Sequence, residues 1–310
     1  MNKLSKKKKL NIFNLLIIIL VILYAAFGTD LFKDLKSNLA SVSNLTGSEE
    51  TVDVQANGIL EVYFIDVGQA DSILIKVGSE NMLIDAGNNK DGSLLVNYFN
   101  ELGIDGFSYV IATHPHEDHI GGMDDIINNF KIDKFYMPNK ISTTKTFEDM
   151  LDSLENNGLN YIVPKKGDSF LLGNALFEVV YAGDETNDIN DSSIVLKLTY
   201  GNNKFLFTGD ATSNVEKIIL NQDLESDVLK VAHHGSSYSS TDKFLNAVEP
   251  KYAVISVGKD NTYKHPSNET LKKLNARNIK TYRTDLMGTL IFTSDGRNIK
   301  VANTKTNTNG

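Results

Sequence analysis

The stretch Thr113-His114-Pro115-His116-Glu117-Asp118-His119-Ile120-Gly121-Gly122 decides the architecture of this 310-residue chain. It sets three imidazoles and two carboxylates into six positions, directly after the apolar run 109–112. Histidine is otherwise scarce, since the chain has six in all and the remaining ones are His233, His234 and His265. Imidazole and carboxylate groups gathered in this way are typical of a metal site. The stretch therefore predicts a metal-binding loop at the end of a strand.

The spacing within this stretch divides the ligands between two ions. Side chains two positions apart on a tight turn can share one face, so His114 and His116 are predicted to hold one ion while Asp118 and His119 hold a second. The pair Gly121-Gly122 is expected to let the backbone pass close to the ions without a Cβ in the way. The chain has no cysteine, so His, Asp, Glu or Asn must supply every ligand. These ligands suit two Zn²⁺ ions, with Mn²⁺ as the alternative.

The N-terminal residues 1–28 are expected to form a membrane anchor or signal segment. Lys6 to Lys9 precede an apolar run from Leu10 to about Phe27, whose length of about 18 residues lies between a signal-peptide core and a full span. An uncleaved anchor is favoured over a cleaved signal. The preceding lysines predict that the rest of the protein lies outside the cytoplasm, anchored to the membrane or secreted. Residues 29–57 are polar and are interpreted as a flexible stalk.

Residues 58–303 are predicted to form one folded domain, followed by a polar tail, 304–310. Alternating or continuous apolar runs indicate strands, and apolar residues on one helical face indicate helices. Strands are expected at 59–65, 72–77, 81–85, 109–113, 176–181, 194–200, 204–208, 228–232, 252–257, 289–293 and 298–301, and helices at 93–102, 123–130, 146–156, 214–220 and 268–276. Two strand-rich halves, each with helices and a ligand at a strand end, predict an α+β fold in which two sheets pack between helix layers, an αββα sandwich.

Further candidate residues follow the later strands. Asp210 ends the run Thr208-Gly209-Asp210, and two ions about 3.5–4 Å apart need a bridging anion such as its carboxylate. His233 and His234 follow the run 228–232, and adjacent residues leave a strand in opposite directions, so only one is expected to be a direct ligand. The sequence does not say which. His265 is a substrate-binding group, a ligand or a structural residue.

These motifs resemble those of known proteins. The pattern His114-x-His116-x-Asp118-His119 with its glycine pair resembles the metal motif of the metallo-β-lactamase superfamily, and Thr208-Gly209-Asp210 resembles its bridging-aspartate motif. The runs 66–71, 190–193, 229–240 and 263–266 are similar to the hydrolase domain of ComEC-type competence proteins. The resemblance spans about residues 59–302 and implies the metallo-β-lactamase fold.

One departure from the family pattern concerns the first ion. The superfamily usually supplies another histidine between the first cluster and the bridging aspartate, and none occurs here between His119 and Asp210. The resemblance implies that a residue among Asn187, Asp188, Asn190 and Asp191 takes this place, with Asn190 or Asp191 favoured. The first ion is therefore expected to be held less tightly, and occupancy by a single ion stays open.

The resemblance implies a metal-dependent hydrolase, a phosphodiesterase or nuclease, and the lysine run predicts that it lies outside the cytoplasm. Asp118 is expected to orient a metal-activated water, and substrate binding is the favoured role of His265. Five of the 31 basic residues lie within the first 27 positions, which leaves 26 basic against 39 acidic residues, a net charge of −13. Such a charge disfavours tight binding of long duplex DNA and favours short phosphodiesters. The alternatives are a lactonase, esterase or β-lactam hydrolase on the same metals, or a non-catalytic competence-associated module. No protein partner can be inferred.

Overall fold

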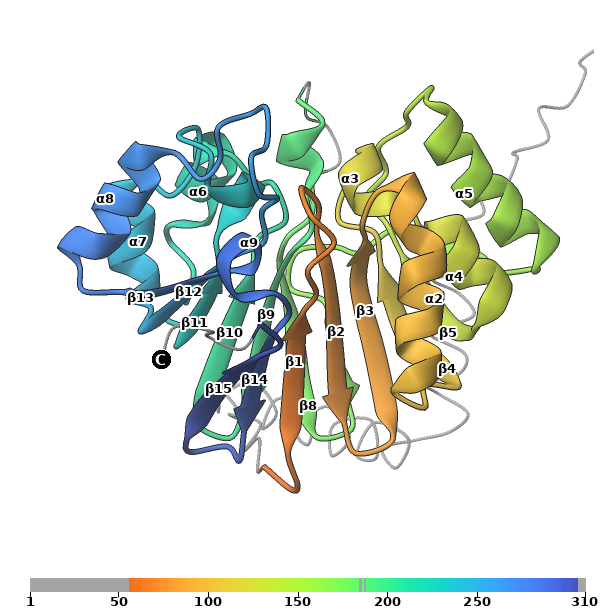
Figure 1. Cartoon of the computed structure of the whole chain (residues 1–310), viewed down its shortest axis with the longest axis horizontal. Coiled ribbons are helices and arrows are strands. Elements are labelled where there is room, and N and C mark those ends of the chain that lie inside the picture. Colours follow the sequence, from red (N-terminus) through yellow and green to blue (C-terminus); the bar gives the residue numbers. More distant parts are fainter. Residues whose placement is uncertain (1–55, 184–185, 187, 306–310) are drawn as a thin grey trace, which may run out of the picture. The chain divides into compact units, whose positions relative to one another are not determined.

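Two mixed β-sheets lie at the centre of the part of the chain that the structure describes (Figure 1). The computed structural model describes residues 56–183, 186 and 188–305, all within the unit Asp53–Gly310. The first sheet has the order β15-β14-β1-β2-β3-β4-β5-β6 and the second the order β13-β12-β11-β10-β9-β8-β7. The strands of the first sheet are β1 (Leu60–Phe64), β2 (Ser72–Val77), β3 (Glu80–Ala86), β4 (Gly106–Ile111), β5 (Lys131–Tyr136), β6 (Tyr161–Ile162), β14 (Leu290–Ser294) and β15 (Ile299–Asn303). Those of the second are β7 (Ser169–Leu172), β8 (Ala175–Tyr181), β9 (Val195–Tyr200), β10 (Asn203–Phe207), β11 (Val228–Lys230), β12 (Tyr252–Ile255) and β13 (Lys280–Arg283).

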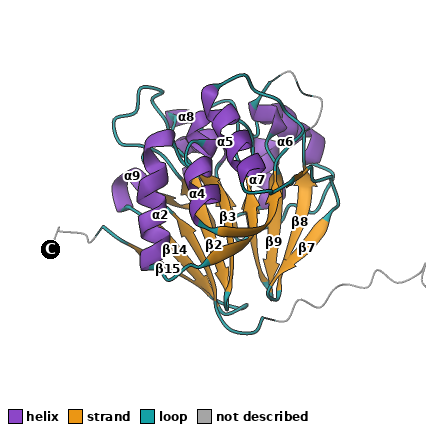
Figure 2. Cartoon of the chain, turned by 90° about the vertical axis from the view of Figure 1, so that its right-hand side faces the viewer, coloured by secondary structure: helices purple, strands orange, loops and turns teal. Residues whose placement is uncertain are grey.

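Helices cover the outer face of each sheet (Figures 1 and 2). Helices α2 (Gly92–Glu101), α3 (Glu117–Ile120), α4 (Met123–Asn129) and α5 (Lys145–Asn156) lie on the first sheet, and α6 (Ser213–Ile219), α7 (Asp242–Val248) and α8 (Asn268–Ala276) on the second. A short helix, α9 (Thr284–Met287), follows β13. Four helices begin at hydroxyl residues whose side chains accept a backbone N–H, namely Thr144, Thr212, Thr241 and Ser267. Such caps stabilise a helix by about 1 kcal/mol each.

Three apolar cores account for this layering. The middle core joins residues of both sheets, among them Phe64 and Phe292 of the first and Phe205 and Phe207 of the second. The other two cores lie between each sheet and its own helices. Because both faces of the central strands are covered, most residues of β2 and β10 are buried, and three apolar residues follow one another in each, at 73–75 and 205–207. The predicted αββα sandwich with mixed sheets is confirmed.

The sequence patterns missed strands β5, β6, β7 and β13 and helices α3, α7 and α9. In β5 only Phe135 is buried, so its charged and exposed residues give no strand pattern. Strands β7 and β13 lie at the two edges of their sheet, and only one residue of each is buried. Their pairing is decided by neighbouring strands rather than by their own composition.

The segments predicted at the two termini lie mostly outside the residues that the structure describes. The predicted membrane segment 1–28 and most of the stalk 29–57 lie outside the described residues, as does most of the polar tail 304–310. Within the described part of the chain, no helix combines the length and the apolarity needed to cross a membrane.

Candidate metal centre

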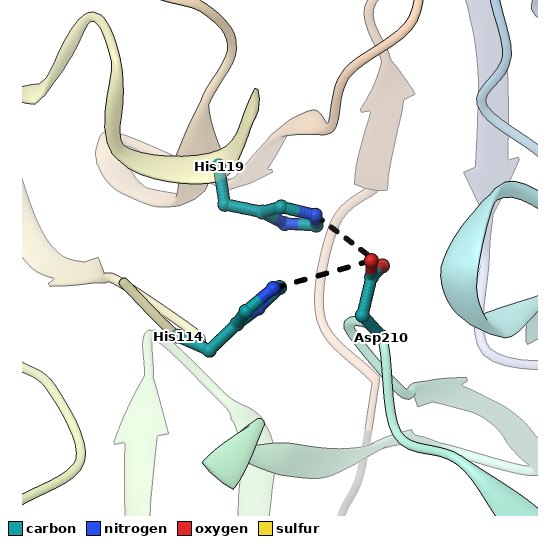
Figure 3. Close-up of side chains that lie close together, drawn as sticks. All are labelled: His114, His119 and Asp210. Atoms are coloured by element: carbon teal, nitrogen blue, oxygen red, sulfur yellow. Dashed lines mark ion pairs between the residues drawn. The ribbon is translucent and has the colours of Figure 1, made fainter. Parts of the chain in front are cut away.

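The predicted ligands converge because the strands that carry them are parallel and end at one edge of each sheet. Strand β4 leads to His114, β10 leads to Asp210, and β11 leads to His233 and His234. Figure 3 shows His114, His119 and Asp210 pointing toward one another. His119 Nε2 lies 3.3 Å from Asp210 Oδ1, and His114 Nε2 lies 4.0 Å from Asp210 Oδ2. The loops following parallel strands are where open α/β sheets place their sites.

A second group of ligand atoms lies on the same centre. Asp118, His119 and His234 each offer an atom within 4.8 Å of the others, and His234 Nε2 is 3.2 Å from Asp118 Oδ2. His116 stands at the start of α3, with its Nδ1 3.0 Å from His114 Nε2. The structure thus brings together the four ligand residues of the first cluster with residues of the second sheet.

The histidine rings are held in the tautomer that a metal ligand needs. His119 donates its Nδ1–H to Asp85 Oδ2 over 2.7 Å, and His234 donates its Nδ1–H to the carbonyl oxygen of Ser256 over 3.0 Å. A neutral imidazole that carries its proton on Nδ1 has a lone pair on Nε2. In both residues this Nε2 faces the centre, an arrangement that hydrogen-bond partners behind a metal ligand commonly impose.

Asp85 orients two histidines at once and was not recognised from the sequence. Its carboxylate accepts the backbone N–H of Thr113 over 2.8 Å and the Thr113 hydroxyl over 2.7 Å, besides the His119 ring. Because the Thr113 hydroxyl gives its hydrogen to Asp85, it is free to accept from His114 Nδ1, 3.2 Å away. The available signal was an aspartate at the end of the predicted strand 81–85.

A buried ion pair joins the two sheets behind the centre. Lys230 Nζ lies 2.7 Å from Asp71 Oδ2, and both side chains are buried. Asp71 Oδ1 is 3.4 Å from His234 Nδ1. Burial alone would raise the pKa of Asp71, but the charges of Lys230 and His234 outweigh it and hold that pKa below its usual value. Asp71 belongs to the first sheet's loops and Lys230 to β11, so this pair ties the halves of the centre together.

The electrostatics of the centre follow from four carboxylates, three of them buried, around two buried imidazoles. Burial disfavours the charged ring of His119, yet the carboxylates of Asp210, Asp85 and Asp118 raise its pKa well above the usual value. Burial likewise opposes charge on His234, but Asp210 and Asp71 raise the pKa of His234 to about 10. The same contacts hold the pKa of Asp210 well below its usual value despite its burial.

The donor atoms fit a divalent cation. His119 Nε2, His234 Nε2 and Asp210 Oδ1 are buried and make no hydrogen bond of normal geometry with the described residues. Buried polar atoms are almost always hydrogen-bonded, so each such atom requires an explanation. A bound metal ion would explain why these three buried nitrogen and oxygen atoms have no hydrogen-bond partner. Their chemistry suits zinc or manganese.

His233 and His234 do not follow the alternation expected of a strand. Strand β11 ends at Lys230, and both histidines lie in the turn η3 (Ala232–Gly235) with φ of 51°. His233 Nε2 is 3.6 Å and His234 Nε2 3.9 Å from the same oxygen, Asp210 Oδ2. The premise that the two side chains diverge is therefore wrong, because the positive φ angles turn both rings toward Asp210. His234 is buried and belongs to a convergent group, whereas His233 is 24 % exposed.

The structure does not bring Asp191 into the cluster. Its buried carboxylate accepts the Thr212 hydroxyl and the Asn214 amide, the latter over 3.2 Å. Ser193 lies nearer the centre, where its hydroxyl is 3.4 Å from His114 Nδ1 and accepts the backbone N–H of Asp210 over 3.0 Å. Of the other candidates for this position, Asn187 lies outside the described residues.

The glycine pair allows a close backbone contact, but this contact differs from the one expected. A Cβ on Gly121 would meet the backbone of Asn88 and Asn89 at 2.1–2.5 Å, and one on Gly122 would meet the Ala86 carbonyl oxygen at 2.5 Å. The backbone N–H groups of both glycines donate to this same segment, at Gly87 and Ala86. The close contact is thus with the loop after β3 rather than with the ions, because α3 is packed onto that loop.

The centre opens into a cavity of about 390 Å³. His116, Asp118, Asp210, His233 and His265 are among its lining residues. Burial, together with the imidazoles of His233 and His234, lowers the pKa of His265 to about 4. His265 is therefore neutral at neutral pH, stands on the cavity wall and is absent from the convergent ligand groups among the described residues.

Comparison with known proteins agrees with this geometry. A family model described as the metallo-beta-lactamase superfamily matches residues 65–259. The chain is 30% identical over 254 residues to ComE operon protein 3 of Bacillus subtilis, covering 75% of this chain and 33% of that protein. It is 31% identical over 232 residues to competence protein ComA of Neisseria gonorrhoeae, covering 73% of this chain and 31% of that protein. The chain thus spans about a third of the length of these relatives.

A solved structure shares the fold. The metallo-beta-lactamase fold protein YhfI of Bacillus subtilis aligns with a TM-score of 0.51 at 11% identity, over 72% of this chain and 95% of that protein.

Proposed function

Since the chain belongs to the metallo-β-lactamase superfamily of metal-dependent hydrolases, we propose that it hydrolyses phosphodiester bonds, outside the cytoplasm, on small esters or oligonucleotides. The observation that carries the proposal is the convergence of His114, His119 and Asp210 with Asp118 and His234 at the floor of an open cavity. The name of one relative, competence protein ComA, refers to competence, which directs the proposal toward nucleic acid.

The ligand atoms suggest how two ions would be shared. His114, His116 and Asp210 would hold one, and Asp118, His119 and His234 the other, with zinc or manganese as the ion. Bound divalent ions would polarise a phosphoryl oxygen. They would also make a water acidic enough to act as a nucleophile near neutral pH.

Asp118 and His265 are the residues of this chain that would handle water and substrate. Burial raises the pKa of Asp118, but His119 and His234 outweigh it and keep that pKa below its usual value, so the carboxylate is ionised at neutral pH. It can therefore accept a hydrogen bond from the attacking water. His265 is neutral, which gives its ring one donor and one acceptor for substrate oxygens.

The distribution of charge supports short substrates. Two lysines that could have formed a basic stripe for duplex DNA are paired with acids instead, Lys131 with Asp133 at 2.8 Å and Lys145 with Asp149 at 2.5 Å. With a net charge of −13 after residue 27, the protein has little excess positive charge with which to neutralise a long polyanion.

The experiment measures metal content and then rates on bis-p-nitrophenyl phosphate, a dinucleotide, a kilobase duplex and a lactone, at two salt concentrations. We expect about two equivalents of zinc or manganese and faster cleavage of the small phosphodiesters than of the duplex. His265→Ala should mainly raise KM and Asp118→Ala mainly lower kcat. Hydrolysis of the lactone alone would replace the proposal with the carbonyl alternative, and bound metal without turnover would indicate a non-catalytic module.

The external location rests on the lysine run before Leu10–Phe27, a segment outside the described residues. Protease added to intact cells should remove the folded domain. Full protection of the domain in intact cells, with digestion after lysis, would contradict the proposed orientation.

A further inference from the structure

A second cavity lies beside the metal cavity, and His233 lines both. The second has a volume of about 340 Å³ and is bounded by Asn190, Thr212 and Asn214 among others. Each cavity carries one strongly exposed aromatic ring, Tyr263 in the first and Tyr238 in the second, with exposed fractions of 69 % and 74 %. These two cavities, which share the His233 side chain and have a tyrosine each, are together called the groove.

Hydrogen bonds fix the backbone of the loop that carries the Tyr263 ring. It stacks on the His265 ring, with centroids 5.9 Å apart and planes 18° apart. The side chain of Asn261 donates to the carbonyl oxygens of His265, over 2.7 Å, and of Gly258, over 2.9 Å, and accepts the His265 backbone N–H over 3.0 Å. One asparagine thus closes the loop that presents Tyr263, and little order has to be gained when a ligand contacts its outer face.

Tyr238 is presented in the same way. Its backbone N–H donates to the Ser236 hydroxyl over 3.2 Å, and its carbonyl oxygen accepts the Ser213 backbone N–H over 2.9 Å. Its ring nevertheless remains mostly exposed. Two aromatic rings on anchored backbone, flanking a reaction centre, present flat apolar faces at fixed positions.

The charges of the groove indicate which contacts a ligand can make. Among the described residues that line the two cavities there is no lysine and no arginine, whereas Glu117, Asp118, Asp188 and Asp210 are acidic. Away from the metal centre, phosphate groups therefore find no cation in this lining. A ligand that extends along the groove must be bound through flat rings rather than by neutralisation of its backbone, and nucleobases stack on tyrosine in this way.

We propose that this groove binds a single-stranded nucleic acid, with one unpaired base stacked on Tyr263 and another on Tyr238 on either side of the bond at the metal centre. The inference rests on the proposed phosphodiesterase activity for the position of that bond. Paired bases cannot offer their faces to a tyrosine, so the groove selects unpaired strands. Binding should also depend only weakly on salt, since few phosphates are neutralised.

The test uses the absence of tryptophan from the chain. Tyr263→Trp and Tyr238→Trp each introduce a single fluorescent reporter, and Tyr161→Trp is the matched control, because Tyr161 is 45 % exposed on the edge strand β6 and lines neither cavity. The full-length variants are titrated with oligodeoxythymidylate and with a base-free deoxyribose phosphate oligomer of equal length. The oligonucleotide should quench both groove reporters and leave the control unchanged, while the base-free oligomer should quench none. Equal quenching of all three, or quenching by the base-free oligomer, would overturn the inference.

Alanine variants give the size of the effect. Tyr263→Ala and Tyr238→Ala should each weaken oligonucleotide binding by about 5- to 150-fold, the range typical of one stacked base, whereas Tyr→Phe at either position should bind like the wild type. Thermal unfolding by circular dichroism checks that each variant is folded. Alanine variants that bind as tightly as the wild type would overturn the inference.

The two proposals fail in distinguishable ways. If the wild type cleaves no phosphodiester but the tryptophan reporters are quenched by the oligonucleotide, the proposed activity is wrong and the stacking groove stands. If the wild type cleaves oligonucleotides at a rate that neither alanine variant changes, the activity stands and the stacking groove is wrong.

Discussion

The metal centre has two halves that are built in different ways. The first half comes from one short loop and helix, which carry His114, His116, Asp118 and His119 within six positions. The second half comes from two separate loops, with Asp210 after β10 and His234 after β11. Local spacing is therefore sufficient to assemble the first half, whereas the second half exists only because parallel strands end side by side.

The residues that orient the metal ligands also differ between the two halves. Asp85 and Thr113, from the same sheet, orient the first half. His234 depends on the backbone of Ser256 and on Asp71, which belongs to the opposite sheet. The second half therefore depends on contacts between the sheets, and its residues should affect folding as well as chemistry.

Alanine substitution of one histidine in each half should have the largest effect and should distinguish the two halves. His116→Ala should abolish measurable turnover without unfolding the protein, since loss of a group one step behind a metal ligand already costs about 10- to 100-fold. His234→Ala should abolish turnover and also lower the free energy of unfolding, because it removes a partner of both Asp71 and Asp118. Turnover, metal content and urea unfolding of both variants check this. Equal stability losses in the two variants would remove the distinction between the halves.

The next effect concerns the ion pair that joins the sheets. Lys230→Met removes the nearer of the two cations beside the buried Asp71 and should lower the free energy of unfolding by about 3–5 kcal/mol. Lys251→Met is the matched control, because Lys251 pairs with Asp227 at the same 2.7 Å but is 74 % exposed, so its loss should cost less than about 1 kcal/mol. Urea unfolding measures both. Similar losses for the two variants would show that Lys230 does not stabilise the junction of the halves.

The smallest expected effect is the pH dependence of metal binding. Without an ion, His119 in the first half and His234 in the second hold protons at neutral pH, since nearby carboxylates raise the pKa of both despite their burial, that of His234 to about 10. A metal must displace these protons, so its apparent affinity should rise with pH, by about tenfold per pH unit for each proton released. Calorimetric titrations in buffers of different ionisation enthalpy count the protons.

A control for this measurement is His265→Ala. The pKa of His265 is lowered to about 4 by burial and by the neighbouring imidazoles, so its ring carries no proton charge to release at neutral pH. The variant should release as many protons as the wild type. Metal affinity that stays constant between pH 6 and 8 would contradict the protonation pattern assigned to both halves.

Much of the fold was predictable because its central elements carry strong local patterns. The continuous apolar run of β2 was predicted with the observed bounds, Ser72–Val77, since burial on both faces leaves no ambiguity about its type. The two strands that pair as β14 and β15 were also predicted, at 289–293 and 298–301. Strand β5 was not, because its pairing with β4 is a property of the sheet and its own residues are mostly exposed.

The chemistry of the centre, namely which imidazoles and carboxylates are available, could be predicted from the amino-acid sequence, because ligand type is a property of each side chain and the first cluster is local. Packing of the two sheets turns both His233 and His234 toward Asp210, lets Asp85 orient two histidines, and places Asp191 against Thr212 and Asn214. These outcomes depend on backbone angles and on contacts between segments far apart in the chain. Spacing along the sequence carries no information about them until the sheets are packed.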